Sequence, residues 1–302
     1  MKQSLTPKQV ARAIGVSESS LKRWCDRGLL PFTKTAGGHR RLTIDHVLEF
    51  LRRERFELVE PEVLGLPVST GRGTLVLDRA RSTLLEALTH GDEEACTRIV
   101  FDLFLGGVPL ATVCDEVLAR AFELVGAGWQ CDTLNIYQER RACELCLRVL
   151  NQLSSAIVPP RVDAPVAVGC TGPGDNYALP TRMIELVLRD AGWHATSLGC
   201  NLPFAAMTAA LRDARPQVFW VSVSHVDDED LLAAGCRELL EAAHQLPCAR
   251  VLVGGRGVSD EFRTRLPELV YGHSMTDMLQ QLADLSPQRP VESAVTSLGS
   301  VD

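Results

Sequence analysis

The stretch Thr35-Ala36-Gly37-Gly38-His39-Arg40-Arg41-Leu42 decides how the N-terminal part of this chain folds. Its two adjacent glycines permit a backbone reversal through positive φ and predict the turn of a β-hairpin. Two arginines follow at the exit of the turn, where they can flank a row of DNA phosphates or enter the minor groove. The stretch therefore predicts a basic hairpin.

Two short helices precede the hairpin, and each has a clear start signal. Thr6 is the expected N-cap of the first helix, and Gln9 completes a capping box with it. Ser17 caps a second helix that ends near Asp26. Gly15 allows a tight turn between the two helices, which is the geometry that a helix-turn-helix needs to present its second helix to the major groove.

The outward side chains of the second helix, which include Ser19, Lys22 and Arg23, can reach base edges and phosphates. A third helix, capped by Asp45, completes the unit. The stretch 5–51 resembles the MerR and excisionase-type winged helix families, whose wing commonly reads Gly-Gly-His-Arg-Arg ahead of a third helix. The resemblance implies that the partner is double-stranded DNA. It also implies that the residues facing the DNA are Lys22, Arg23, His39, Arg40 and Arg41.

Charge is distributed unevenly along the chain. The formal net charge is −7, yet residues 1–56, which we call the head, carry 12 Lys and Arg against 5 Asp and Glu, so that the rest carries −14. Phosphate binding needs clustered positive charge, and contact with DNA is therefore expected in the head. No apolar run is long enough to span a membrane, and the chain starts without an apolar signal segment, so we expect a cytoplasmic protein.

Periodicity divides the remainder of the chain. Helical patterns with short breaks predict an antiparallel four-helix bundle, and short apolar runs alternating with helical stretches then predict a doubly wound parallel sheet. The expected fold is multi-domain, α and α/β. Its expected segments are 1–56 winged helix-turn-helix, 57–76 linker, 77–160 four-helix bundle, 161–286 Rossmann-like α/β domain and 287–302 disordered tail.

The ten cysteines are scattered, and only Cys143 and Cys146 form a Cys-x-x-Cys pair, inside a helical pattern. Without a second pair at zinc-site spacing, we interpret them as small buried hydrophobes among reduced thiols, and we predict no metal site. We expect no enzyme either, because the chain has no Gly-rich phosphate loop, Gly-x-Ser-x-Gly elbow or His-Glu-x-x-His motif.

Nearly the whole chain resembles the cobalamin-dependent, light-sensing MerR-type repressors of the CarH and LitR group, which implies a cobalamin-binding-like domain at residues 161–286. In that family a tryptophan is followed, after nine intervening residues, by Glu-His. The tryptophan and the Glu-His pair cover the upper face of the corrin. Here Trp129 is followed by nine residues and then Glu139-Arg140, so that an arginine replaces the histidine. Arginine is always cationic and cannot ligate cobalt as a neutral imidazole does.

The second landmark of that family is the loop after the first strand, which carries an acidic residue, a histidine that is the lower axial ligand, and a glycine. Here the loop reads Asp175-Asn176-Tyr177-Ala178-Leu179-Pro180, with tyrosine for the histidine and proline for the glycine. A phenol with an ordinary pKa of about 10 is a poor cobalt ligand at neutral pH. The third landmark is kept: Ser222 stands where the family places a serine beside the nucleotide tail, and Gly254-Gly255 matches its Gly-Gly turn.

With both histidines replaced, three interpretations stay open. The domain is an apo scaffold for dimerisation or partner contact, which we favour, or it binds another tetrapyrrole such as haem or a bilin, or it binds cobalamin without the lower histidine. Candidate replacement ligands are His194, His225, Cys170 and Cys200. The candidate pocket residues are Trp129, Glu139, Arg140, Asp175, Tyr177, Ser222, His225, Gly254 and Gly255.

The expected mechanism is control by association. A small head binds DNA weakly alone, whereas a homo-oligomer, a dimer or tetramer built through the bundle and the α/β domain, links several heads and gains affinity through effective concentration. Repression rather than activation is implied by the family alone. A cobalamin-type enzyme is the distant alternative.

Overall fold

The computed structural model describes residues 4–54, 56, 58–67, 74–130, 135–246 and 249–283. They belong to two compact units, one up to Ile157 and one from Val158 onward, and each unit is described by itself. The segment 287–302, expected to be a disordered tail, lies outside the described residues. Within the described ranges, every helix is too short or too polar to cross a lipid bilayer.

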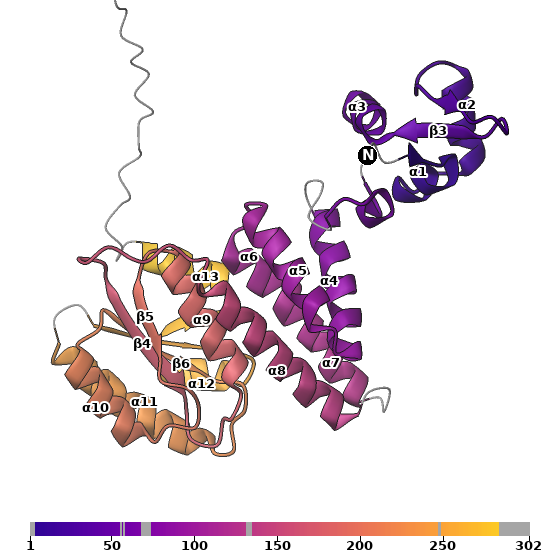
Figure 1. Ribbon diagram of the computed structural model, residues 1–302. Helices are drawn as coiled ribbons and strands as arrows, with labels where there is room; N and C mark the ends of the chain where they lie inside the picture. Colours follow the sequence, from indigo (N-terminus) through magenta and orange to yellow (C-terminus); the bar gives the residue numbers. More distant parts are fainter. Residues whose placement is uncertain are drawn as a thin grey trace, which may run out of the picture. The chain divides into compact units, whose positions relative to one another are not determined.

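The head is a winged helix-turn-helix (Figure 1). The sheet has the antiparallel order β1-β3-β2, with β3 in the middle. The capping box of Thr6 and Gln9 and the cap at Ser17 are both present, as predicted. The elements are β1 (Ser4–Leu5), α1 (Pro7–Ala13), α2 (Glu18–Asp26), β2 (Thr33–Lys34), β3 (Arg40–Thr43) and α3 (Ile44–Glu54).

One core holds the three helices of the head together. Val10 of α1, Leu21 of α2 and Val47 of α3 are all fully buried in it. Trp24 of α2 packs its ring against Phe50 of α3, with 5.3 Å between the ring centroids. Burial of such aliphatic and aromatic side chains is the main source of stability for so small a unit.

The segment 58–66, expected to be linker, is instead part of the head. Leu58 and Leu64 are buried in the core of the head, and η1 (Pro61–Leu64) is a short 3₁₀ helix. The N–H groups of Val59 and Glu60 both donate to the carbonyl oxygen of Ala13 at the end of α1, at 2.7 and 3.1 Å. The segment has no periodicity because tertiary contacts, not a regular element, hold it in place.

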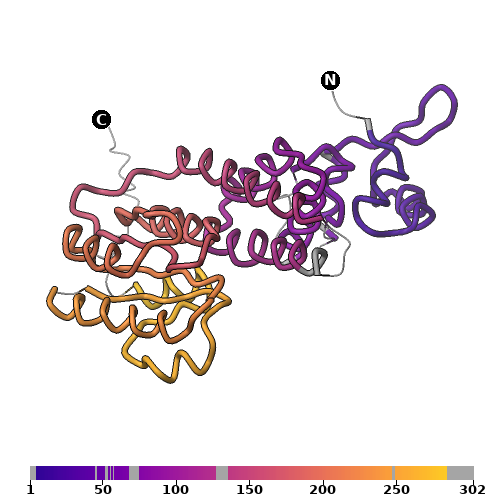
Figure 2. The backbone as a smooth tube through the Cα atoms, turned by 90° about the horizontal axis from the view of Figure 1, so that it is seen from below, coloured from indigo at the N-terminus to yellow at the C-terminus, as the bar shows by residue number. Residues whose placement is uncertain are grey.

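The described chain resumes at α4 and forms the expected four-helix arrangement (Figures 1 and 2). Helix α4 contacts α5, η2, α7 and α8. The third helix of the arrangement is continuous from α6 to α7 and contains a stretch of π-helix, η2. The elements are α4 (Thr74–His90), α5 (Glu93–Leu105), α6 (Leu110–Thr112), η2 (Val113–Ala119), α7 (Arg120–Gln130) and α8 (Ile136–Leu153).

The second unit is a doubly wound sheet with five described strands, all parallel, in the order β5-β4-β6-β7-β8. Helices α10 and α11 cover one face, and α9 and α13 lie on the other (Figure 1). The alternation of strands and helices predicted from sequence is confirmed, whereas α12 was not predicted. The elements are β4 (Val166–Thr171), α9 (Ala178–Asp190), β5 (His194–Ser197), α10 (Phe204–Ala214), β6 (Val218–Ser222), α11 (Glu229–His244), β7 (Arg250–Gly254), α12 (Asp260–Arg265), β8 (Val270–Gly272) and α13 (Met275–Leu282).

Trp220 fills the space between the sheet and α9. Its side chain is fully buried, and its indole N–H donates to the hydroxyl of Thr181 on α9 at 2.9 Å. Gly169 lies opposite Trp220 in the register of β4 and β6, and a Cβ added there would stand 2.1 Å from the indole ring. The glycine in β4 is therefore required by the size of the tryptophan beside it.

We predict that Gly169→Ala lowers the free energy of unfolding by about 2 kcal/mol or more, because overpacking a dense core forces side chains and backbone to shift. Urea unfolding followed by tryptophan fluorescence measures the change. Gly172→Ala is the matched control, since its added Cβ would meet atoms only at 4.0 Å. Equal stability of the two variants would contradict this account of the packing.

Candidate DNA interface and ligand pocket

Helix α2 presents a polar face to solvent and an apolar face to the core. Ser19, Lys22 and Arg23 are exposed, whereas Leu21 and Cys25 are buried on the opposite side. This division follows from the 3.6-residue period of the helix. The exposed face carries the three side chains of this helix that the sequence assigned to DNA contact.

The wing is a short hairpin formed by β2 and β3. Thr33 pairs with Arg41 and Lys34 pairs with Arg40. The turn is closed by the N–H of Thr35, which donates to the carbonyl of His39 at 2.9 Å, and it contains Gly38 at φ +76°. The predicted glycine-based reversal is therefore present.

Arg40 is held inside the head. Its guanidinium donates to the backbone carbonyl of Lys22 at 2.9 Å and to the carboxylate of Asp26 at 2.7 Å, and it lies 5.1 Å from the centre of the Phe32 ring. These contacts join the wing to α2 through charge-assisted hydrogen bonds and a cation–π contact. The structure thus places Arg40 as a connection between the two elements, a role that the sequence did not predict, and its contact with DNA stays a prediction.

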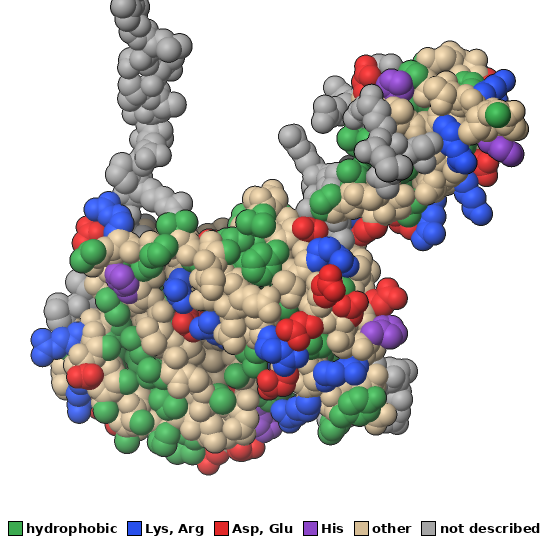
Figure 3. Space-filling model, viewed as in Figure 1, with side chains coloured by type: hydrophobic (Ala, Val, Ile, Leu, Met, Phe, Trp, Pro, Cys, Tyr) green, Lys and Arg blue, Asp and Glu red, His purple; other side chains and the backbone are tan. Residues whose placement is uncertain are grey.

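His39 is exposed at the surface of the head, and Arg41 is half-buried there. Successive side chains of a strand point to opposite faces, so Arg41 lies on the other side of β3 from Arg40 and the buried Leu42. The side chains of Arg41 and His39 have no hydrogen-bond or ion-pair partner within the described parts of the chain. Lys34, which the sequence reasoning missed, is exposed in β2, where it pairs with Arg40. Figure 3 shows several Lys and Arg side chains protruding from the visible surface of the head.

In the second unit, Asp175 ties two loops together. Its side chain is 1% exposed, and its carboxylate accepts hydrogen bonds from the N–H groups of Tyr177 at 3.0 Å, Ser224 at 2.6 Å and His225 at 3.3 Å. The loop after β4 is thereby joined to the loop after β6. A buried carboxylate needs such partners, and here the backbone supplies them.

Tyr177 lies at the start of α9, where the family has its lower cobalt ligand. Its ring lies beneath the guanidinium of Arg256, 5.4 Å from the ring centre. Pro180 lies in the first turn of α9, where its missing N–H breaks no helical hydrogen bond. The tyrosine therefore has a cation–π partner that the sequence reasoning did not identify.

The Gly254-Gly255 pair has a structural cause in the close approach of neighbouring strands. A Cβ at Gly254 would lie 2.7 Å from the carbonyl oxygen of Gly272, and one at Gly255 would lie 2.2 Å from that of Val223. Gly255 also has φ +122°, which favours glycine. The match to the Gly-Gly turn of the family is thus explained by backbone packing within the sheet.

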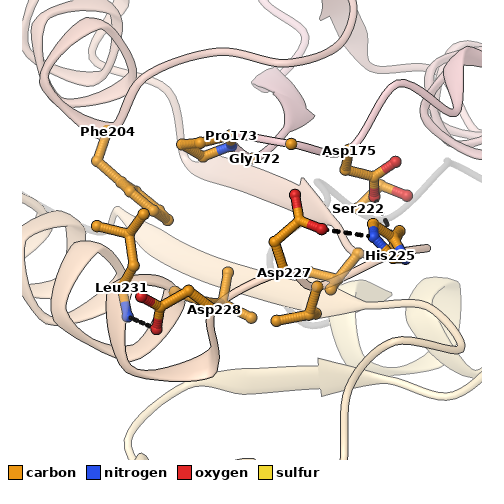
Figure 4. A pocket seen from close by; sticks show the side chains of 13 residues that line it. Gly172, Pro173, Asp175, Phe204, Ser222, His225, Asp227, Asp228 and Leu231 are labelled. Atoms are coloured by element: carbon orange, nitrogen blue, oxygen red, sulfur yellow. Dashed lines mark hydrogen bonds and ion pairs between the residues drawn. The ribbon is translucent and has the colours of Figure 1, made fainter.

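A pocket of about 130 Å³ lies where β4 and β6 end (Figure 4). Asp175, Ser222 and His225 line it, so the structure brings these three predicted residues together. Tyr177, Gly254 and Gly255 do not line it. In an open parallel sheet with this strand order, ligands bind at the carboxyl ends of the strands where the order reverses, and β4 and β6 are those strands.

The other predicted pocket residues belong to the first unit. Glu139 and Arg140 are half-buried and exposed, respectively, in the first turns of α8. Trp129 belongs to α7, and its side chain lies outside what the structure describes.

The residues present do not fit a cobalt ion held by histidines at the positions of the family. Arg140 and Tyr177 occupy those two positions, and the described residues contain no group of three or more His, Cys, Asp or Glu side chains that could hold a metal ion. Of the candidate replacements, His194 shares a hydrogen bond with the carbonyl of Arg161 at 2.7 Å. Burial raises the pKa of the Cys170 thiol to about 12, so that it is a neutral thiol at pH 7.

Of the Cys-x-x-Cys pair of α8, Cys146 agrees with the interpretation as a buried residue, whereas Cys143 is only half-buried. Cys146 is buried, and burial raises the pKa of its thiol far above the ordinary value. Burial also raises the pKa of the neighbouring Cys96 to about 11. Such thiols are protonated at neutral pH and react slowly.

Comparison with known proteins supports the same architecture. The profile of the family described as "Helix-turn-helix domain" matches residues 4–55, and that of the "B12 binding domain" family matches residues 80–154. The chain is 24% identical over 270 residues to the HTH-type transcriptional repressor CarA of Myxococcus xanthus, and the alignment covers 86% of this chain and 89% of the relative. It therefore combines a helix-turn-helix domain with a B12-binding domain and is a distant homologue of CarA.

Two corrinoid proteins are also similar. Trimethylamine corrinoid protein 1 of Methanosarcina acetivorans is 19% identical over 209 residues, which cover 65% of this chain and 92% of that protein. The solved monomethylamine corrinoid protein of Methanosarcina barkeri is 13% identical, with a TM-score of 0.58, and covers 69% of this chain and 99% of that one. The structural likeness shows that the helical region and the parallel sheet have the fold of a corrinoid protein.

We predict that Arg40→Ala raises amide hydrogen exchange across residues 33–43 about tenfold, because it removes two hydrogen bonds from a charged group and the contact with Phe32. Hydrogen exchange of the full chain with mass spectrometry measures it. Arg41→Ala is the matched control, because Arg41 is one residue away on the opposite face of β3 and has no side-chain hydrogen bond to a described residue; it should leave exchange unchanged. Equal effects of the two variants would contradict the connecting role of Arg40.

Proposed function

We propose that this protein is a sequence-specific, DNA-binding regulator of transcription that acts as a repressor. The observation that carries the proposal is the attachment of the wing to α2 through Arg40, which combines two basic elements into one surface. On this surface, Ser19, Lys22 and Arg23 of α2 enter the major groove, and His39 and Arg41 of the wing contact the adjoining backbone or minor groove. The similarity to a named repressor supports the direction of regulation.

The charge distribution supports the same assignment of roles. Residues 1–56 carry +7, whereas the remainder of the chain carries −14. A duplex attracted by the head is repelled by the remainder, so the acidic parts favour the orientation in which the head alone meets DNA. We propose that dimers or tetramers formed through the body (residues 77–286) link several heads and raise the affinity for operators with repeated half-sites.

We further propose that the B12-binding domain acts in oligomerisation or partner contact, without a cobalt ion ligated as in the family and without catalysis. Support comes from Arg140 and Tyr177 at the two histidine positions, and from the Arg256 guanidinium that lies over the ring of Tyr177. The positive charge of Arg256 beside the position of the lower cobalt ligand disfavours a cobalt ion there.

A second candidate function is a regulator that binds cobalamin, or another tetrapyrrole, in a different mode. The match of residues 80–154 to the B12 binding domain profile and the corrinoid-protein fold favour it. The lower axial position of the cobalt ion would then be filled by a ligand other than histidine, or by water.

We predict that Lys22→Ala and Arg41→Ala each weaken binding to a duplex selected by the full chain from a random pool. For a residue that contacts phosphate, affinity should fall for all sequences, and the slope of log K against log salt should fall by about one. Fluorescence anisotropy over a salt series measures both quantities.

Arg161→Ala is the control for this series, because Arg161 is an exposed arginine of the second unit with 77% of its side chain accessible. It should bind as the unchanged protein does. Failure of the full chain to bind any duplex, even at low salt and high concentration, would refute the proposed function.

We predict that the chain, incubated with adenosylcobalamin in the dark and passed over a gel filtration column, elutes without visible absorption. The physical reason is the absence of an imidazole from both expected cobalt positions. Co-elution of about one equivalent would favour the second candidate function. In that case Tyr177→Phe, which removes only the phenol hydroxyl, tests whether this oxygen contributes to the binding.

A further inference from the structure

We propose that the pocket at the carboxyl ends of β4 and β6 binds a small organic cation, an ammonium group joined to an apolar body about as large as a benzene ring. The proposal concerns the second unit alone and does not depend on DNA binding. Thirteen residues line the pocket: Phe204 and Leu231 lie on one side with Asp228 beside Leu231, and Asp175, Asp227 and His225 lie on the other side (Figure 4).

Hydrogen bonds join the loops that form the pocket. The three N–H donors to the buried Asp175 carboxylate fix the loop after β4 against the loop after β6. The N–H of Gly174 also donates to the side chain of Asn201 at 2.9 Å, which fixes the same loop from the side of β5. A preformed site loses little conformational entropy when it binds, so that a small ligand can be held.

The side of Phe204 and Leu231 is built from α10 and α11. The ring of Phe204 packs against α11 at Gly235, where an added Cβ would lie 2.1 Å from the ring, so the ring has a fixed position. Leu231 and Leu232 line the pocket beside it, and Leu231 is 52% exposed although it is a large apolar residue. A ligand body that covers these side chains removes apolar surface from water.

The acidic residues of the lining determine the charge of the ligand. The lining includes three carboxylates, Asp175, Asp227 and Asp228, and His225 is the only lining side chain able to carry a positive charge. An anion entering this pocket would meet repulsion, whereas an ammonium group would be attracted.

Two of the three carboxylates, Asp227 and Asp228, each keep one oxygen without a hydrogen bond to a described residue. Asp175 accepts three backbone hydrogen bonds, and Asp228 caps α11 by accepting from Asp230 and Leu231 at 2.9 Å. One oxygen of Asp227 pairs with His225 at 2.8 Å.

The other oxygen of Asp227 would lie 2.4 Å from a Cβ at Gly174, so it occupies space that the glycine leaves open. Within the described ranges, no hydrogen-bond donor faces this second oxygen. It is the atom we assign to the ammonium group.

A second polar group in the pocket is also without a partner. Ser222 lines the pocket and is 1% exposed, and its hydroxyl forms no hydrogen bond with any described residue. The Ser222 oxygen is not among the fully buried atoms that lack a partner, so it reaches solvent in the pocket, where a ligand or water can bond to it. The size of the ligand follows from the volume: about 130 Å³ is close to a cavity of roughly 150 Å³ that holds benzene.

The test is isothermal titration calorimetry of the full chain with three probes of similar shape: benzylammonium, benzyl alcohol and benzoate. We expect saturable one-to-one binding of benzylammonium, binding of benzyl alcohol about tenfold weaker, and no binding of benzoate. Asp227→Asn should weaken benzylammonium about tenfold, since a charge-assisted contact becomes a neutral one. Asp227 is largely exposed, so the variant should fold.

Asp213→Asn is the matched control. It neutralises an exposed carboxylate near the C-terminal end of α10, whereas Phe204 is at the N-terminal end of this helix. It should bind benzylammonium as the unchanged protein does. The proposal is overturned if benzylammonium does not bind, if benzoate binds as well as it does, or if Asp227→Asn leaves the affinity unchanged.

Discussion

The DNA-facing surface proposed for this protein depends on one contact, the guanidinium of Arg40 on the Lys22 carbonyl and the Asp26 carboxylate. A two-residue β2 paired with a short β3 is too small to hold a fixed position alone. The arginine connects it to the last turns of α2, so that the hairpin and the recognition helix move as one body. The same contact turns Arg41 outward, because neighbouring side chains of a strand point in opposite directions.

Local chemistry made much of the fold predictable. The caps at Thr6 and Ser17, the glycine turn of the wing and the alternation of strands and helices all follow from short-range rules. The role of Arg40 could not be predicted, because it depends on a carboxylate 14 residues away that only the folded chain brings near. The docking of Leu58 and Leu64 was missed for the same reason.

For the candidate pocket, too, the sequence predicted some features and not others. Of the nine pocket residues proposed from sequence, Asp175, Ser222 and His225 line one pocket, since all three lie at or just beyond strand ends at one edge of the sheet. Their roles were not accessible from sequence: Asp175 is occupied by backbone N–H groups, and the Gly254-Gly255 pair serves the approach of neighbouring strands. A match to a family motif can therefore have its cause in the fold, and by itself it does not establish the chemistry of the site.

The central claim, that α2 and the wing form one surface for duplex DNA, is tested most directly by hydrogen exchange of the full chain with and without a bound duplex. The account predicts that DNA slows exchange in residues 18–23 and 34–41 together, and leaves α1 around Lys8 and the helices α10 and α11 unchanged. Protection of the wing without α2, or of the acidic second unit in place of the head, would contradict it.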